Sequence, residues 1–196
     1  MQKAKGSPKI KVLVVCTGNI CRSPMAQQML QQLLHAAGLQ DKFELVSAGT
    51  NPQLGSALHP QTAQSMQALG FEPQPHLPQH LTKEQIEASQ LVLSATIEHR
   101  GQVAQLLPSA NAKNFTLLEF ARLSEFLMTD EFESERKALS IAEKLQLANR
   151  LRGYAPPALQ EESIVDPWGQ DRDVFTEVAE LTEKSAISIV TFLGEK

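Results

Sequence analysis

The sequence has few cysteines, no long apolar run and no excess of positive charge, and each absence excludes a class of protein. Cys16 and Cys21 are too few for a disulfide framework, and no obvious partners complete a four-ligand zinc site. The apolar runs are only a few residues long, which excludes a membrane span and a signal peptide. The net charge of −4 indicates no polyanion-binding surface, so we expect neither nucleic acid nor a membrane as a partner.

The length of 196 residues predicts one domain, residues 1–196, with an ample core. Residues 1–8 are mostly polar or basic and predict a loose N-terminus.

The strongest pattern in the chain begins at Val12. Residues 12–15 are consecutive apolar residues, which predict a strand buried on both faces. Ser23-Pro24 then opens a helix, with serine at the N-cap and proline at the first helical position. The backbone amides between these elements converge near a helix N-terminus, where unpaired N–H groups favour an anion. They belong to Thr17, Gly18, Asn19, Ile20, Cys21 and Arg22.

Cys16 stands at the mouth of this anion cradle. The positive field that binds a phosphate also stabilises a thiolate, so we expect Cys16 to ionise easily. Arg22 offers a planar fork that matches two oxygens of a phosphate. The pattern therefore predicts a cysteine nucleophile that faces a bound phosphoryl group. A functional thiolate fits the reducing cytoplasm.

Strands and helices alternate along most of the chain. Apolar segments at 12–15, 43–47, 91–94 and 115–118 predict four strands, and helical spacing predicts helices at 24–37, 59–69, from 82, at 97–107 and from 173. This alternation predicts an α/β fold in three layers, doubly wound, with a four-stranded parallel sheet flanked by helices. Ligands of such sheets gather at the carboxyl ends of the strands, where Cys16 lies.

The segment after residue 124 departs from this alternation. Residues 134–152 carry an apolar stripe at helical spacing that ends at Gly153, which predicts one amphipathic helix. Residues 154–158 read as a linker.

Asp166 lies in a second chemical stretch, Ile164-Val165-Asp166-Pro167-Trp168-Gly169. Phosphate ester hydrolysis needs a proton for the leaving oxygen, and a nearby carboxylic acid can supply it. Pro167 stiffens the backbone beside the carboxyl group and limits where it can swing.

The loop Cys16-Thr17-Gly18-Asn19-Ile20-Cys21-Arg22-Ser23-Pro24-Met25-Ala26 resembles that of the low-molecular-weight protein tyrosine phosphatase family. The resemblance implies hydrolysis of phosphotyrosine or aryl phosphate monoesters through a phosphocysteine intermediate, with inorganic phosphate as product and no metal or other cofactor. Catalysis would then fall to Cys16, Arg22 and Asp166, phosphate binding to residues 17–23, and stacking on the substrate ring to Trp168.

The resemblance also implies supporting roles around the loop. It gives Ser47 and His76 as partners of Asn19. From the residues themselves, Asn19 tolerates the left-handed backbone of a tight anion loop, and Ser23 would donate to the Cys16 sulfur as well as cap the helix. Cys21 either forms a reversible disulfide with Cys16 or is a small packed thiol. The family core is shorter than this chain, so residues 125–161 are interpreted as a helical insertion that either packs as an extra helix or gates a substrate or binds a partner.

The chain departs from the family pattern at three places. His76-Leu77-Pro78-Gln79-His80-Leu81 lacks an arginine, and Ser94-Ala95-Thr96 lacks an acidic residue. Asn51-Pro52-Gln53-Leu54 stands where one aromatic wall of the tyrosine slot is usual, which weakens the case for phosphotyrosine.

Three alternatives remain. Protein-arginine phosphatases of the same fold tend to carry threonine where this chain has Ile20, so Ile20 favours phosphotyrosine. Arsenate reductases relay electrons through further cysteines, and none follows Cys21. A non-catalytic phosphate-binding or thiol-sensing module is disfavoured because all three catalytic residues are present.

Overall fold

The computed structural model describes residues 8–158 and 161–195. The expectation of a loose N-terminus falls on residues 1–8, of which 1–7 lie outside the described residues. The sheet contains β1 (Ile10–Cys16), β2 (Phe43–Gly49), β3 (Leu91–Ser94) and β4 (Asn114–Thr116). Its strands are all parallel and run in the order β2-β1-β3-β4, which confirms the predicted doubly wound α/β fold.

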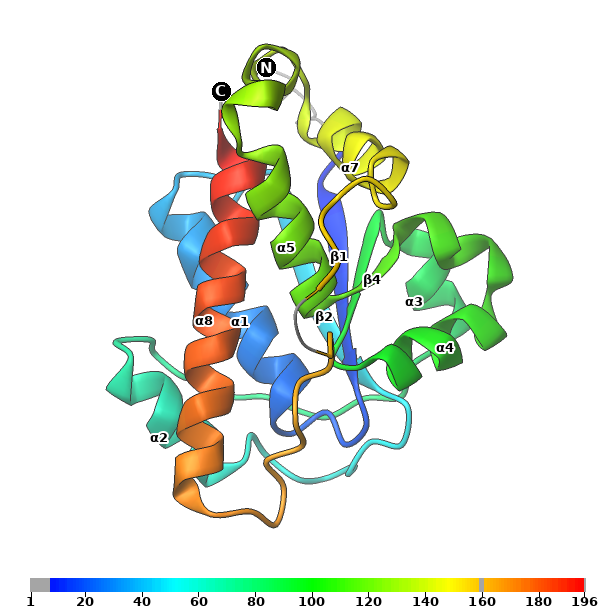
Figure 1. Cartoon of the computed structure of the whole chain (residues 1–196). Coiled ribbons are helices and arrows are strands. Elements are labelled where there is room, and N and C mark those ends of the chain that lie inside the picture. Colours follow the sequence, from blue (N-terminus) through cyan, green and yellow to red (C-terminus); the bar gives the residue numbers. More distant parts are fainter. Residues whose placement is uncertain (1–7, 159–160, 196) are drawn as a thin grey trace, which may run out of the picture.

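Helices cover both faces of the sheet, as Figure 1 shows. One layer contains α1 (Arg22–Ala36), α5 (Leu117–Leu127) and α8 (Arg172–Gly194), with α2 (Pro60–Ala68) packed against α1 and α8. The other layer contains α3 (Lys83–Ala88) and α4 (Ile97–Leu106). The remaining helices are the 3-10 turns η1 (Pro108–Lys113) and η2 (Asp130–Phe132), α6 (Glu133–Lys137) and α7 (Ile141–Arg150).

The central strand β1 is buried on both faces, as its sequence predicts. Val12 and Val14 belong to the core under α1, α5 and α8. Leu13 and Val15 point the other way, into the smaller core that contains Ile86 of α3. Because successive side chains of a strand alternate between faces, only a continuous apolar run fills both cores.

The predicted strand at 115–118 is wrong in its second half. Thr116 ends β4, and its hydroxyl accepts a hydrogen bond from the amide of Glu119 while the Glu119 carboxylate accepts one from the amide of Thr116. This capping box starts α5 at Leu117, a helix that the sequence analysis missed. Apolar residues at 117 and 118 satisfy both a strand pattern and a buried helix, and the cap decides between them.

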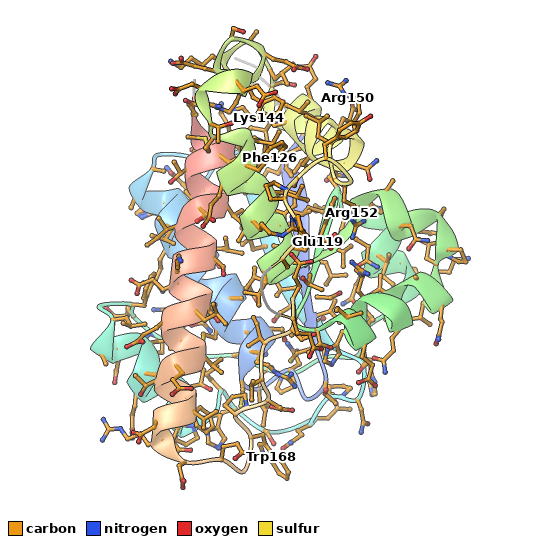
Figure 2. The ribbon with its side chains drawn as sticks, viewed as in Figure 1. Glu119, Phe126, Lys144, Arg150, Arg152 and Trp168 are labelled. Carbon is orange, nitrogen blue, oxygen red and sulfur yellow. The ribbon has the colours of Figure 1, made fainter. Side chains whose placement is uncertain are left out.

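The single helix predicted at 134–152 is also wrong. It is divided into α6 and α7, because Ser140 forms a second capping box with Glu143 and starts a new helix. The apolar stripe of α7, which includes Leu145, Leu147 and Ala148, packs on the core under α5 and α8. In Figure 2, Lys144 of α7 and Trp168 lie at opposite ends of the molecule.

Side chains of α6 and α7 cap the C-terminus of α8. The Lys144 side chain is buried, and its Nζ donates to the carbonyl oxygens of Phe192 at 2.9 Å and Glu195 at 2.6 Å. The Arg136 guanidinium pairs with the Glu195 carboxylate and donates to the carbonyl of Leu127 at the end of α5. These cations satisfy carbonyl groups that a helix leaves unpaired at its C-terminus.

Replacing Lys144 by methionine is expected to destabilise the fold by about 1–3 kcal/mol, because buried carbonyls lose their donor while the apolar stem is kept. The free energy of unfolding from denaturant titration measures this effect. The matched control is Arg150→Met on the same helix, since Arg150 pairs with Glu135 at the exposed surface, where such pairs contribute about 0–1 kcal/mol. Equal losses in the two variants would contradict the capping role.

Candidate active site

The last residue of β1 places a cysteine at the carboxyl end of the sheet. Cys16 pairs in register with Gly49 of β2 and is 2% exposed. The helix after the loop begins at Arg22 with Cys21 as N-cap residue, so the prediction of Ser23 as the N-cap is wrong by two positions. Ser23 lies in the first turn of α1, and its hydroxyl does not cap the helix. It points toward the loop and lies 2.9 Å from the Cys16 Sγ.

Two donors reach the sulfur of Cys16. The backbone amide of Asn19 donates to the Sγ at 3.3 Å. The Ser23 hydroxyl oxygen accepts from the Asn19 Nδ2 at 2.9 Å, which leaves its own proton for the sulfur. Both contacts therefore place a hydrogen-bond donor against the sulfur.

The loop turns its carbonyl groups outward. The carbonyls of residues 16, 17, 18 and 20 accept hydrogen bonds from the amides of Thr50, Asn51, Gln53 and His59, at 2.9–3.1 Å. Within the part of the chain that the structure describes, the amides of residues 17, 18, 20 and 21 donate to no protein group. These four residues all line one pocket, and a loop with several unpaired amides of this kind can form a nest for an anion.

Asn19 holds the loop in shape from inside. Its φ of 53° is the left-handed conformation predicted for it, and its side chain is fully buried. The Nδ2 also donates to the Ser47 hydroxyl at 2.9 Å, and the Oδ1 accepts from the amide of Gln79. His76 donates from Nε2 to the carbonyl of Asn19 at 2.8 Å, and burial lowers the pKa of His76. The structure thus brings both predicted partners to Asn19.

Gly49 gives the loop room to approach β2. A Cβ at this position would lie 2.4 Å from the carbonyl oxygen of Thr17 and 3.1 Å from the Cβ of Asn19. Neither the buried loop backbone nor Asn19 has space to move aside, since both are tied by the hydrogen bonds described above.

Replacing Gly49 by alanine is therefore expected to displace the loop, reduce turnover at least about tenfold and destabilise the protein by about 1–3 kcal/mol. Hydrolysis of an aryl phosphate and thermal unfolding measure the two effects. Gly101→Ala in α4 is the matched control, because nothing lies within 4 Å of its added Cβ and alanine favours a helix. A Gly49→Ala variant with the activity of Gly101→Ala would refute this role.

Arg22 and Asp166 meet at the mouth of the loop. The Arg22 Nη2 lies 2.6 Å from the Asp166 Oδ2, and its Nη1 donates to the carbonyl of Ile164 at 3.2 Å. The Arg22 Nε is buried and has no hydrogen-bond partner among the described residues. The Asp166 carboxylate is half exposed and also accepts from the amide of Trp168 at 3.2 Å. One edge of the guanidinium is thus held by the 164–168 segment, and Nε remains for a ligand.

The loop lines a pocket of about 220 Å³ that contains the predicted catalytic side chains. Trp168 is 58% exposed and forms part of its wall, so it is not a core residue. The pocket is lined by Cys16, Thr17, Gly18, Ile20, Cys21, Arg22, Asn51, Gln53, Asp166 and Trp168. Asn51 and Gln53 thus supply polar groups in the stretch that lacks the aromatic wall usual in the family.

Cys21 differs in chemistry from Cys16. Burial, with smaller contributions from the nearby Cys16 and Asp166, raises the pKa of Cys21 to about 11. The side chain packs against Ile20 and Phe175 of α8. Cys21 is therefore a neutral thiol at physiological pH.

His99 is a residue of the site that sequence reasoning missed. It is 5% exposed, and its Nε2 lies 2.8 Å from the Oγ1 of Thr17. Burial, together with the charge of Arg22, lowers the pKa of His99 to about 4, so its ring is neutral at physiological pH. The available signal was its place in the first turn after β3, because this turn lies at the carboxyl edge of the sheet.

A thiol, a guanidinium and converging amides at this edge define the class of proteins that bind an oxyanion beside a cysteine. The sequence model of the "Low molecular weight phosphotyrosine protein phosphatase" family matches residues 11–130, and the chain belongs to this family of cysteine-dependent phosphatases. Asp166 and Trp168 lie beyond the matched residues.

Individual relatives carry two kinds of name. The chain is 31% identical to the low molecular weight protein-tyrosine-phosphatase Ptp of Acinetobacter johnsonii, over 54% of this chain and 70% of that protein. It is 33% identical to a protein-arginine-phosphatase of Geobacillus stearothermophilus, over 62% of this chain and 78% of that protein. A solved low molecular weight protein tyrosine phosphatase from T. tengcongensis has the same fold, with a TM-score of 0.69 and 22% identity over 93% of this chain and 99% of that one.

No helix in residues 8–158 and 161–195 has the length and apolar composition needed to cross a membrane.

Proposed function

We propose that this member of the family hydrolyses phosphotyrosine or other aryl phosphate monoesters through a phosphocysteine at Cys16. The observation that carries the proposal is the set of donors without a protein partner around one sulfur. Five donors make no hydrogen bond to any residue that the structure describes: the Arg22 Nε and the amides of residues 17, 18, 20 and 21. All of these residues line the pocket. A phosphoryl group has the charge and the oxygens to fill such a site.

In the first step, the Cys16 thiolate attacks phosphorus and the bond to the ester oxygen breaks. Asp166, in its acid form, gives its proton to the departing oxygen. The phosphoryl oxygens compete with the Asp166 carboxyl group for the Arg22 guanidinium, which contacts it at 2.6 Å. Binding of substrate would thus release the carboxyl group from the guanidinium and prepare it as the acid.

In the second step, Asp166 takes a proton from water, which attacks phosphorus and breaks the bond to sulfur. Inorganic phosphate leaves, and Cys16 returns to the thiolate. The Ser23 hydroxyl, 2.9 Å from the sulfur, stabilises the departing thiolate.

A second candidate is a protein-arginine phosphatase. The polar groups of Asn51 and Gln53 favour it, since amide oxygens can accept hydrogen bonds from a guanidinium leaving group. Ile20 and the exposed Trp168 favour an aromatic leaving group, which packs on apolar and aromatic surfaces.

The test combines trapping with competition. Rapid acid quench with an aryl phosphate should leave a phosphoryl group on the peptide that contains Cys16, detected by mass spectrometry. Peptides with phosphotyrosine and phosphoarginine, offered together, should show faster release from phosphotyrosine. If no residue is phosphorylated, or a residue other than Cys16 is, the mechanism is refuted. Faster release of phosphate from phosphoarginine would show that the substrate is phosphoarginine and not phosphotyrosine.

The same proposal includes a disulfide between Cys16 and Cys21 that protects Cys16 from irreversible oxidation. Peroxide converts the Cys16 thiolate to a sulfenic acid, and the Cys21 thiol displaces water to form the disulfide. Wild type treated with peroxide should recover activity on reduction, whereas Cys21→Ser should accumulate irreversible sulfinic acid at Cys16. Equal recovery in both proteins would show that Cys21 is only a packed thiol. A reducing compartment keeps Cys16 active, which supports a cytoplasmic location.

A further inference from the structure

We propose that His99 is a positioning residue that holds the Thr17 hydroxyl as a hydrogen-bond donor to the phosphoryl group in the pocket. The inference rests on the proposed function and adds a side-chain donor to the amides of the loop. It is carried by a chain of three polar side chains that runs from α4 to the pocket wall.

The series of hydrogen bonds begins at Thr96, the N-cap residue of α4. The Thr96 Oγ1 accepts a hydrogen bond from the backbone amide of His99 at 3.2 Å, and it lies 2.6 Å from the Nδ1 of the same residue. One lone pair of the hydroxyl is therefore occupied by the cap. The hydroxyl proton has no other acceptor among the described residues, so we assign Thr96 as the donor and Nδ1 as the acceptor.

This assignment fixes the proton on the other ring nitrogen. A neutral imidazole carries one N–H, and with Nδ1 as acceptor the hydrogen is on Nε2. The Nε2 then donates to the Thr17 Oγ1 at 2.8 Å. The ring is neutral, as the lowered pKa of His99 requires, and its burial prevents exchange of these partners with solvent.

The proton of the Thr17 hydroxyl is left for the pocket. Thr17 lines the pocket together with Cys16 and Arg22, and its hydroxyl oxygen already accepts from His99. Because the oxygen of this hydroxyl faces the His99 N–H, its proton points away from His99. A phosphoryl oxygen in the pocket is the strongest acceptor expected for that proton. Without His99, the same hydroxyl would be free to rotate and to point its lone pairs at the anion.

Binding of inorganic phosphate to the full-length protein, measured by calorimetry, tests the inference without the need for turnover. Thr17→Val should raise the Kd about tenfold or more, the effect expected of a lost hydrogen bond to a charged group. Thr17→Ser should keep the wild-type Kd, because serine retains the hydroxyl. His99→Asn should raise the Kd, since its amide can replace Nδ1 but is too short to reach Thr17. His99→Gln should restore binding, because its Nε2 can donate to Thr17.

A double-mutant cycle separates positioning from a general loss of structure. In the Thr17→Val background, His99→Asn should cause no further loss of phosphate affinity, because both residues act through one hydroxyl. Additive losses, or a Thr17→Val variant with the wild-type Kd, would overturn the inference. Alkylation of Cys16 by iodoacetamide should proceed at the same rate in all variants, and a slower rate in His99→Asn alone would instead indicate a collapsed loop.

The two proposals can fail separately. If wild type binds phosphate and shows the expected cycle but forms no phosphocysteine, the positioning role stands and the proposed function falls. If wild type hydrolyses aryl phosphates while the losses are additive, the function stands and the role of His99 falls. If wild type neither binds phosphate nor forms a phosphocysteine, both are refuted.

Discussion

Replacing Cys16 by serine is expected to lower kcat for p-nitrophenyl phosphate on the order of 10⁴-fold or more. A serine hydroxyl is not ionised at neutral pH, and the loop offers it no base, since the contacts of the sulfur are an amide donor and the Ser23 hydroxyl. The donors that surround the anion site are unchanged in this variant. Phosphate binding, measured by calorimetry, should therefore survive while turnover is lost.

The two cysteines provide an internal control for this result. Iodoacetamide at pH 7 should modify Cys16 and leave Cys21 intact, because the pKa of Cys21 is raised to about 11 by burial. The single adduct should disappear in Cys16→Ser, and phosphate should protect it in wild type. Equal activity of wild type and Cys16→Ser would exclude the phosphocysteine mechanism outright.

Local signals in the sequence were sufficient to predict the first strand, the loop after it and the helix that follows. Residues 12–15 predict a buried strand because they are apolar on both faces. The residues after them predict a tight loop and the start of a helix, and the structure has both. The placement of Asn19 in a left-handed conformation follows from the residue type. These features depend on neighbours in the sequence, so a single chain reveals them.

The contacts that complete the site depend on distant parts of the chain. His99 is 82 positions from Thr17, and nothing in the sequence near either residue indicates that they touch. The Arg22 side chain meets Asp166 across 144 positions, and the register of Gly49 beside Cys16 is set by strand pairing. Pairings of this kind come from the packing of whole elements, which sequence periodicity does not encode.

The errors in the helix predictions have the same local cause. Thr116 and Ser140 each start a helix where the apolar pattern continued without a break, because a capping box satisfies amides that the pattern ignores. In both cases the threonine or serine is followed three positions later by glutamate, a signal that was present in the sequence. The interpretation of residues 125–161 as a family insertion stays a prediction.

Replacing Asp166 by asparagine is expected to slow hydrolysis of phosphotyrosine about 10²–10³-fold, while p-nitrophenyl phosphate loses much less. The nitrophenolate departs without a proton, whereas the tyrosine oxygen needs one. Asparagine keeps the size of the side chain and one of the two acceptor oxygens, so it can accept from either the Arg22 Nη2 or the amide of Trp168, which bond to different oxygens of the carboxylate. The measurement is kcat for a series of aryl phosphates of decreasing leaving-group acidity, with Asp173→Asn, an exposed residue in the first turn of α8, as the charge-matched control. A loss of the same size for every leaving group would mean that Asp166 only holds Arg22, because proton donation is the one role whose value grows as the leaving oxygen becomes more basic.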